Sequence, residues 1–214
     1  MRHHFLIQPS AFIRFFMICL CAAIFASPLF AQNAMAQNAI PNDNTQTAQD
    51  FEALTPQQKL KVLNGQMRSF AAELFSDLGP NELEEVYSLR TSYGIVQSVK
   101  MVRDDLSRAV KSCQDNNDDM ESLTKSFEAW KADINPVVKE AENTVTLAIE
   151  DQKIIDSLKF RAYLERIDKL VEVQENMIDK QYVTDQAACK KLQGRLDETK
   201  EKLSELLKKS IKEI

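Results

Sequence analysis

The chain has 214 residues, 44% of them hydrophobic, with 27 basic and 32 acidic side chains and a net charge of −5. A chain of this length can form one domain with a substantial core. Its acidic balance argues against binding to nucleic acid, which needs a concentrated basic surface.

The first 36 residues have the order of a secretory signal peptide. Arg2 and Arg14 come before or at the start of an apolar run over 15–30, and the tripeptide Ala-Met-Ala at 34–36 offers a cleavage site. A transmembrane helix needs about 20 apolar residues, and this run is shorter, so cleavage is favoured over retention as an anchor. We therefore predict that residues 1–36 are a cleaved signal and that the mature protein is periplasmic or secreted, with no stable membrane insertion.

Cleavage has a chemical consequence, because the only histidines are His3 and His4. The mature chain then contains no histidine, and the loss of Arg2 and Arg14 changes the net charge from −5 to −7. Without histidine the commonest general base, histidine-ligated haem and His-containing zinc sites are excluded. We predict no catalytic residue, no cofactor and no metal site, and a protein that is not an enzyme.

One acidic segment resembles the start of a calcium loop. Residues 115–119 supply acids and amides at the first, third and fifth positions. The sixth position is Met120 instead of glycine and the twelfth is Ser126 instead of glutamate. Helix capping explains the same residues, so the segment is not counted as a metal site.

Residues 37–53 are rich in Asn, Gln, Ala and Thr and have no hydrophobic periodicity, which predicts a disordered leader. A single helical domain is expected over 54–214. Its first helix should start at Thr55, because a capping residue precedes Pro56. The dipeptide Gly79-Pro80 should end that helix and start the second.

The remaining helices are expected to start near Asn117, before 160 and at Thr184, which gives five in all. Apolar residues recur at intervals of three and four in each of them, and no segment alternates with the period of a strand. The fold class is therefore predicted as all-α, an elongated antiparallel bundle of four to five helices. The stripe of the second helix is Ile95, Val99, Val102, Leu106, Ala109 and Cys113, and that of the fourth is Phe160, Tyr163, Ile167, Leu170, Gln174 and Met177.

The third helix poses two questions. Pro136 lies inside it, but the apolar stripe continues in phase, which predicts a bend instead of an end. Between Glu150 and Leu158 there is neither glycine nor proline, so the third and fourth helices could form one rod or a hairpin.

The cysteines favour the hairpin. The mature chain has two, Cys113 and Cys189, and exported proteins usually oxidise such a pair. A hairpin brings them to the same end of the bundle, whereas a rod would place them at opposite ends, too far apart to bond. We therefore predict a break within 151–157 and a disulfide between Cys113 and Cys189, with two reduced, buried cysteines as the alternative.

The segment Leu54-Thr55-Pro56-Gln57-Gln58 resembles the Leu-Thr-x-x-Gln element of the small periplasmic stress chaperones related to Spy and CpxP. The resemblance covers five residues and occurs once, whereas that family has a second copy. It implies an exported, all-helical protein that binds other proteins through its surface.

Four functions remain open. The favoured one is a non-enzymatic binding or structural protein of the cell envelope that contacts a protein partner or a second copy of itself. The alternatives are a carrier of a lipid or other small ligand, a chaperone-like stress protein and, last, an enzyme. Gly94 is expected to allow close helix packing, with close approach of a ligand as the alternative. Arg90 and Arg103 are expected to pair with acids on neighbouring helices, with an anionic ligand as the alternative, and Trp130 is expected to lie in the core instead of forming a binding platform.

Overall fold

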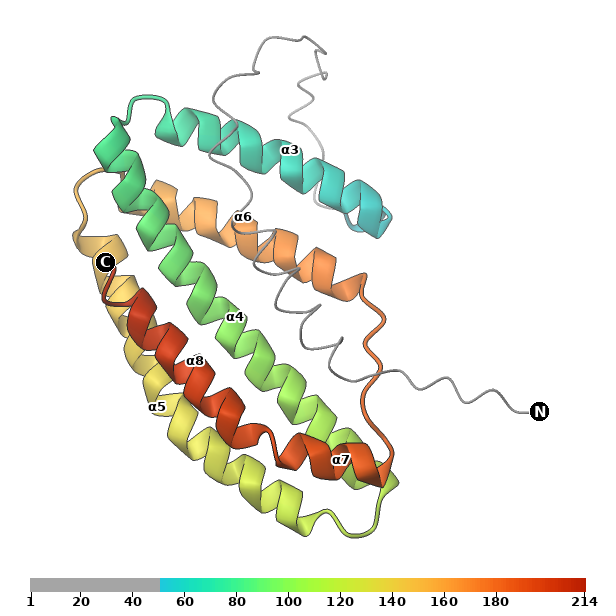
Figure 1. Cartoon of the computed structure of the whole chain (residues 1–214). Helices are drawn as coiled ribbons and strands as arrows, with labels where there is room; N and C mark the ends of the chain where they lie inside the picture. Colours follow the sequence, from blue (N-terminus) through green and yellow to red (C-terminus); the bar gives the residue numbers. More distant parts are fainter. Residues whose placement is uncertain (1–50) are drawn as a thin grey trace. The chain divides into compact units, whose positions relative to one another are not determined.

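The computed structural model describes residues 51–214 (Figure 1). The predicted signal peptide and most of the predicted leader lie outside the described residues. Every regular element of the described part is an α-helix, so the all-α prediction is confirmed. The helices are α3 (Pro56–Phe75), α4 (Pro80–Asn116), α5 (Glu121–Asp151), α6 (Ser157–Asn176), α7 (Gln186–Gln193) and α8 (Leu196–Ser210).

The first two helices begin where the sequence predicts. The Thr55 Oγ1 accepts a hydrogen bond from the Gln58 amide at 3.4 Å, and the Gln58 side chain accepts one from the Thr55 amide at 2.9 Å. These two bonds form a capping box, with Pro56 as the first helical residue. At the start of α4 the Gly79 amide donates to the Glu82 carboxylate at 2.7 Å.

The core is built around α5, which packs against α4, α7 and α8 (Figure 1). The buried side chains of α5 recur every three or four residues, as one stripe of an amphipathic helix must. They are Leu123, Phe127, Trp130, Ile134, Val138, Ala141, Val145 and Ile149. The helix continues through Pro136, as predicted, and Figure 1 shows it following a curved path.

The helices α3 and α6 pack mainly on each other. Their aromatic residues join this pair to α4. The Phe75 ring meets the Tyr163 ring of α6 edge-on at 5.2 Å and the Tyr87 ring of α4 at 6.0 Å. The Arg166 guanidinium of α6 lies 4.2 Å from the centre of the Phe70 ring of α3.

The predicted break between the third and fourth helices is confirmed, since α5 ends at Asp151 and α6 begins at Ser157. One side chain organises the turn between them. The side-chain oxygen Oε1 of Gln152 accepts hydrogen bonds from the backbone amides of Ile154 and Ile155 at 2.8 and 2.9 Å. Its amide nitrogen donates to the Ile155 carbonyl at 2.7 Å. Asp156 then caps α6 by accepting from the Lys159 amide at 2.9 Å.

The start of the third helix was predicted too early. α5 begins at Glu121, and Met120 precedes it without a side-chain cap. The Asn117 side chain is not available to cap α5, because its amide donates to the carbonyls of Cys113 and Thr184 at 3.0 and 2.8 Å. Met120 is buried, so packing fixes the entry to the helix.

The prediction of five helices was also wrong, because the last one is interrupted. α7 ends at Gln193, Gly194 and Arg195 make a short connection, and α8 follows from Leu196. Two basic residues occupy the last turn of α7 and two acidic residues the first turn of α8. Both placements suit the helix dipole at a separate C-terminus and N-terminus. The predicted start at Thr184 is replaced by a cap at Asp185, which accepts from the Ala188 amide at 3.0 Å.

Parts of two predicted stripes are displaced from the core. In α4 the fully buried side chains are Val86, Leu89, Ser92, Val96, Val99, Val110 and Cys113, while Ile95, Val102 and Leu106 are half-buried against them. In α6 only Phe160, Tyr163 and Leu164 are buried, and Met177 is 39% exposed just beyond the helix. The side chains of α6 are thus less buried toward its C-terminus.

Gly94 does not mark a close helix crossing. A Cβ atom built on it meets no heavy atom of the described residues within 4 Å, apart from its own helix and chain neighbours. The prediction of close packing at this position was therefore wrong. Gly65 in α3 has the same open surroundings.

Replacing Gly94 by alanine is expected to stabilise the protein by about 0.5–1 kcal/mol, because alanine loses less backbone entropy in a helix. Urea unfolding followed by circular dichroism measures the change, and Gly65→Ala is the matched variant with the same expected sign. A lower stability for Gly94→Ala alone would reveal a contact at this position and contradict the open surroundings.

Candidate functional site

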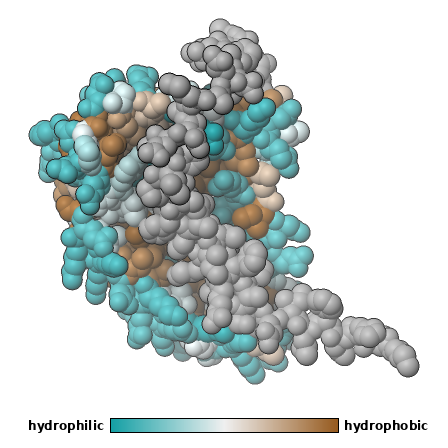
Figure 2. Space-filling model, turned by 45° about the horizontal axis from the view of Figure 1, so that its top comes forward, coloured by the Kyte–Doolittle hydropathy of each residue, from teal (hydrophilic) through white to brown (hydrophobic). Residues whose placement is uncertain are grey.

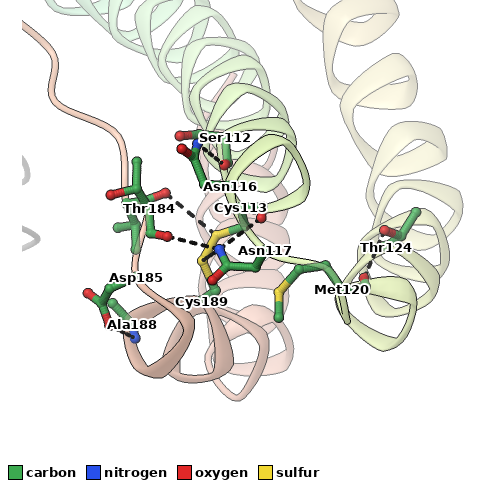
Figure 3. Close-up of a disulfide and its surroundings, with 11 residues drawn as sticks. Ser112, Cys113, Asn116, Asn117, Met120, Thr124, Thr184, Asp185, Ala188 and Cys189 are labelled. Atoms are coloured by element: carbon green, nitrogen blue, oxygen red, sulfur yellow. Dashed lines mark hydrogen bonds between the residues drawn. A yellow bond between two sulfur atoms is a disulfide. The ribbon is translucent and has the colours of Figure 1, made fainter.

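The two predicted site residues, Cys113 and Cys189, lie together and form a disulfide (Figure 3). The sulfur atoms are 2.05 Å apart and the Cα atoms 5.9 Å apart. Cys113 lies in the last turn of α4 and Cys189 in the middle of α7. The bond thus joins the end of the longest helix to the start of the C-terminal segment.

Polar contacts surround the disulfide. Figure 3 shows Asn117 beside it, bonded to the Cys113 and Thr184 carbonyls, so one side chain connects α4 to the residue before the α7 cap. The Gln193 amide donates to the hydroxyls of Ser122 and Ser126 at 2.7 and 3.2 Å. These bonds fasten α7 to α5 beside the covalent link.

The disulfide is enclosed, because neither cysteine has any exposed surface. Thiol–disulfide exchange requires a thiolate to reach one of the sulfur atoms, so a native protein with this burial reacts slowly with reductants. The bond is therefore suited to holding the fold, and no described residue beside it provides the Cys-x-x-Cys pattern of redox catalysts.

A second polar cluster joins α4, α5 and α6. The Tyr93 hydroxyl of α4 donates a hydrogen bond to the Asp168 carboxylate of α6. Lys100, two turns further along α4, forms a 2.9 Å ion pair with Glu142 of α5. Burial raises the pKa of Asp168, and the charge of Lys100 partly opposes this rise. The cluster thus connects the α3–α6 pair to the rest of the core.

Burial has the largest effect on both members of the Tyr93–Asp168 pair. It raises the pKa of Tyr93, and the hydrogen bond and charge of Asp168 raise it further. It also raises the pKa of Asp168, against the opposing effects of the Tyr93 hydrogen bond and of Lys100. The hydroxyl therefore stays protonated over a wide pH range and serves as a permanent donor to the carboxylate.

The pair should make stability fall at alkaline pH. A folded-state pKa above the unfolded value means that unfolding releases a proton once the pH exceeds about 10, the ordinary tyrosine pKa. The free energy of unfolding is thus retained below that pH and declines above it. We expect Tyr93→Phe to flatten this decline, measured by urea unfolding between about pH 8 and about pH 11.

Tyr87→Phe is the matched control for this measurement, because Tyr87 is 45% exposed. Part of the decline should persist in the Tyr93→Phe variant, since burial also raises the pKa of Tyr163. Equal slopes in the wild type and the Tyr93→Phe variant would contradict the expected role of Tyr93.

The two arginines do not meet the expected acids. Arg90 lies over the Tyr163 ring, 5.9 Å from its centre, and makes no ion pair within residues 51–214. Arg103 contacts Asp104, its neighbour on the same helix, at 3.2 Å, and the amide oxygen of Asn135 on α5 at 3.5 Å. Neither one is paired with an acid on a neighbouring helix, so those two predictions were wrong. Trp130 is buried in the core, as predicted.

The surface offers charged and apolar regions. One open hollow is lined mostly by charged side chains of α8 and the residues after it, including Lys208, Lys209 and Lys212, together with Asp133 of α5. Figure 2 shows apolar patches between hydrophilic side chains on one face of the molecule. The most exposed large apolar residues of α5, α6 and the following segment are Leu147, Leu158, Met177 and Ile178.

Within 51–214, no group of three or more His, Cys, Asp and Glu side chains is arranged to hold a metal ion. None of the helices in that range combines the length and apolar composition that a bilayer crossing needs. Local sequence signals could have found the capping residues and the cysteine pair, but not the Tyr93–Asp168 contact, whose members are 75 positions apart.

Comparison with protein-family models, with curated proteins and with solved structures finds no match to this chain.

Proposed function

We propose that this chain is an exported, non-enzymatic protein of the cell envelope that works by binding another protein through its helix surfaces. The observation that supports it best is the exposure of large apolar side chains on α5, on α6 and after α6. Leu158 is 73% exposed, Leu147 57% and Ile178 51%, on a chain that is otherwise rich in charge. When a partner covers apolar side chains that remain in water after folding, the free energy of the system falls, because apolar surface is removed from water.

The disulfide supports the exported location, because such bonds persist in oxidising compartments and are rare in the cytosol. A periplasmic or secreted protein with a buried disulfide and charged helix surfaces is suited to a binding role. The Tyr93–Asp168 pair supports the same proposal over an enzymatic one, since the carboxylate is engaged in fastening two helices.

The other functions have weaker support. A lipid carrier needs an apolar cavity between helices, and the hollow on α8 is open and lined by charge. A chaperone-like role rests on the Leu54–Gln58 element, but Thr55 and Gln58 are engaged in capping α3.

Site-specific photo-crosslinking in the native host tests the proposal. A photoreactive amino acid at Leu158 or Ile178 should yield adducts of higher mass, while the same residue at the exposed positions Lys111 and Lys125 should not. Mass spectrometry then identifies the captured protein. The proposal fails if the apolar positions give no more adduct than the lysine controls. It also fails if the purified protein shows turnover that a single Asp or Glu substitution abolishes.

A further inference from the structure

Apolar packing attaches the α3–α6 pair to the rest of the fold at one end only. The apolar side chains that belong to the main core or pack on it lie within 67–75 of α3 and within 160–167 of α6. In the part of the chain that the structure describes, no apolar residue of α6 beyond Ile167 joins them. The two short connections to the neighbouring helices, residues 76–79 before α4 and 152–156 after α5, lie at this same end (Figure 1).

Toward the other end, α6 and α4 diverge (Figure 1). The helix α6 packs mainly on α3, and its backbone approaches that of α5 at few positions and that of α4 at fewer still. Polar side chains make the connection to α4 instead. The Tyr93–Asp168 hydrogen bond crosses from α4 near the middle of α6, and a second contact crosses near its C-terminus.

This second contact is made by Lys180, in the segment 177–185 that connects α6 to α7. Its ammonium nitrogen lies 2.8 Å from the Asp105 carboxylate of α4 and also pairs with the Glu175 carboxylate of α6. The three side chains are 18–22% exposed, so water and salt screen these charges less than they screen a surface pair. Burial disfavours the charged form of Lys180, but its hydrogen bonds to Asp105 and Glu175 outweigh burial and raise its pKa. We call these three residues the latch.

The connecting segment allows the end of α6 to move. Residues 177–185 are not helical, so they can change length without breaking helical hydrogen bonds. Their far end is fixed, because Val183 packs on the main core and the Thr184 carbonyl accepts a hydrogen bond from Asn117. The α3–α6 pair thus has two short connections at the end with apolar packing and one longer, irregular connection at the end with the latch.

We propose that the α3–α6 pair is a hinged layer that turns about residues 76–79 and 152–156, and that the latch holds its other end against α4. The pair moves as one unit, because α3 and α6 pack on each other more extensively than on any other helix. Opening separates Tyr93 from Asp168 and exposes the facing sides of α4 and α6 to solvent. The latch does not depend on what the protein binds, so its test is independent of the proposed binding role.

Distances between spin labels, measured by double electron–electron resonance on the whole exported chain, report the position of the layer. The labels are carried on a ketone-bearing amino acid, so the disulfide stays intact. Labels at the exposed positions Asn176 of α6 and Ser107 of α4 measure the latch end. Labels at Lys159 of α6 and Glu84 of α4, also exposed, measure the hinge end.

We expect Lys180→Met to raise the population of a longer distance between positions 107 and 176 about tenfold, because it removes both charge-assisted hydrogen bonds of a mostly buried group. The distance between positions 84 and 159 should stay the same. Asp105→Ala should have the same effect as Lys180→Met, since it removes the partner on α4.

Lys200→Met is the matched control. Lys200 forms a 2.8 Å ion pair between α8 and Asp133 of α5, so this variant also removes a link between helices but leaves the latch intact. Both label distances should remain as in the wild type, and circular dichroism establishes that each variant is folded. Asp105→Ala decides alone if Lys180→Met does not fold.

Three results would overturn the hinged layer. One is an unchanged distance between positions 107 and 176 in the latch variants. Another is an equal lengthening at both ends of α6, which means that the pair detaches without a hinge. The third is the same opening in Lys200→Met, which means that the loss of any ion pair between helices loosens the fold.

Discussion

Replacing both cysteines, Cys113→Ala with Cys189→Ala, is expected to lower the free energy of unfolding by about 4 kcal/mol. The disulfide closes a loop between residues that are 76 positions apart, and removing it returns that loop's freedom to the unfolded chain. For a domain of this size, such a loss is a large part of the total stability. Alanine is preferred to serine because both positions are fully buried and a hydroxyl there would need a new partner.

Urea unfolding of the oxidised wild type, the double alanine variant and the wild type with reductant present measures this effect. The matched control is Gln193→Ala, which removes the hydrogen bonds from α7 to Ser122 and Ser126 but leaves the disulfide. It should cost about 1 kcal/mol. If the double variant loses no more than this control, non-covalent contacts hold α7 in place and the disulfide is not the main fastening.

The sequence specified the helix ends that depend on local chemistry. Thr55 with Pro56, and Gly79 with Pro80, act on the backbone within one turn, so their positions could be predicted without knowing the packing. The hairpin between α5 and α6 was predicted by a different argument, the need for Cys113 and Cys189 to meet. The local signal there was weak, because Asp156 caps α6 but the turn itself is organised by the side chain of Gln152.

Other features depend on contacts that periodicity does not encode. An apolar stripe indicates an inward face, but it does not say which neighbour covers that face or over what length. The α6 stripe therefore predicted burial at Met177. This residue follows the end of α6, is exposed and does not belong to the main core. Gly94 likewise suggested a close crossing, although its position on α4 faces no neighbour within 4 Å among the described residues.

The division of the last helix could have been predicted. Lys190 and Lys191 precede Gly194, and Asp197 and Glu198 follow it. Basic residues before a glycine and acidic residues after it are the pattern of one helix ending and another beginning. The apolar stripe continues across the interruption because α7 and α8 both pack on α5, and this continuity concealed the break.

Trp130 stabilises the core by packing more than by hydrogen bonding. Its replacement is therefore expected to have the second large effect on the free energy of unfolding. Trp130 is 2% exposed and its ring stacks on Phe127 at 5.7 Å, but its indole nitrogen has no hydrogen-bond partner among residues 51–214. Trp130→Ala should cost about 3–5 kcal/mol, since it leaves a cavity in the core beside α5. Trp130→Phe should cost much less, because it retains an aromatic ring and forfeits no hydrogen bond. Urea unfolding followed by circular dichroism compares the two, as Trp130 is the only tryptophan in the chain and its fluorescence is lost in both variants. Equal losses would show that the indole nitrogen has a partner, such as a buried water, and that the core is fixed by polarity at this point as well as by packing.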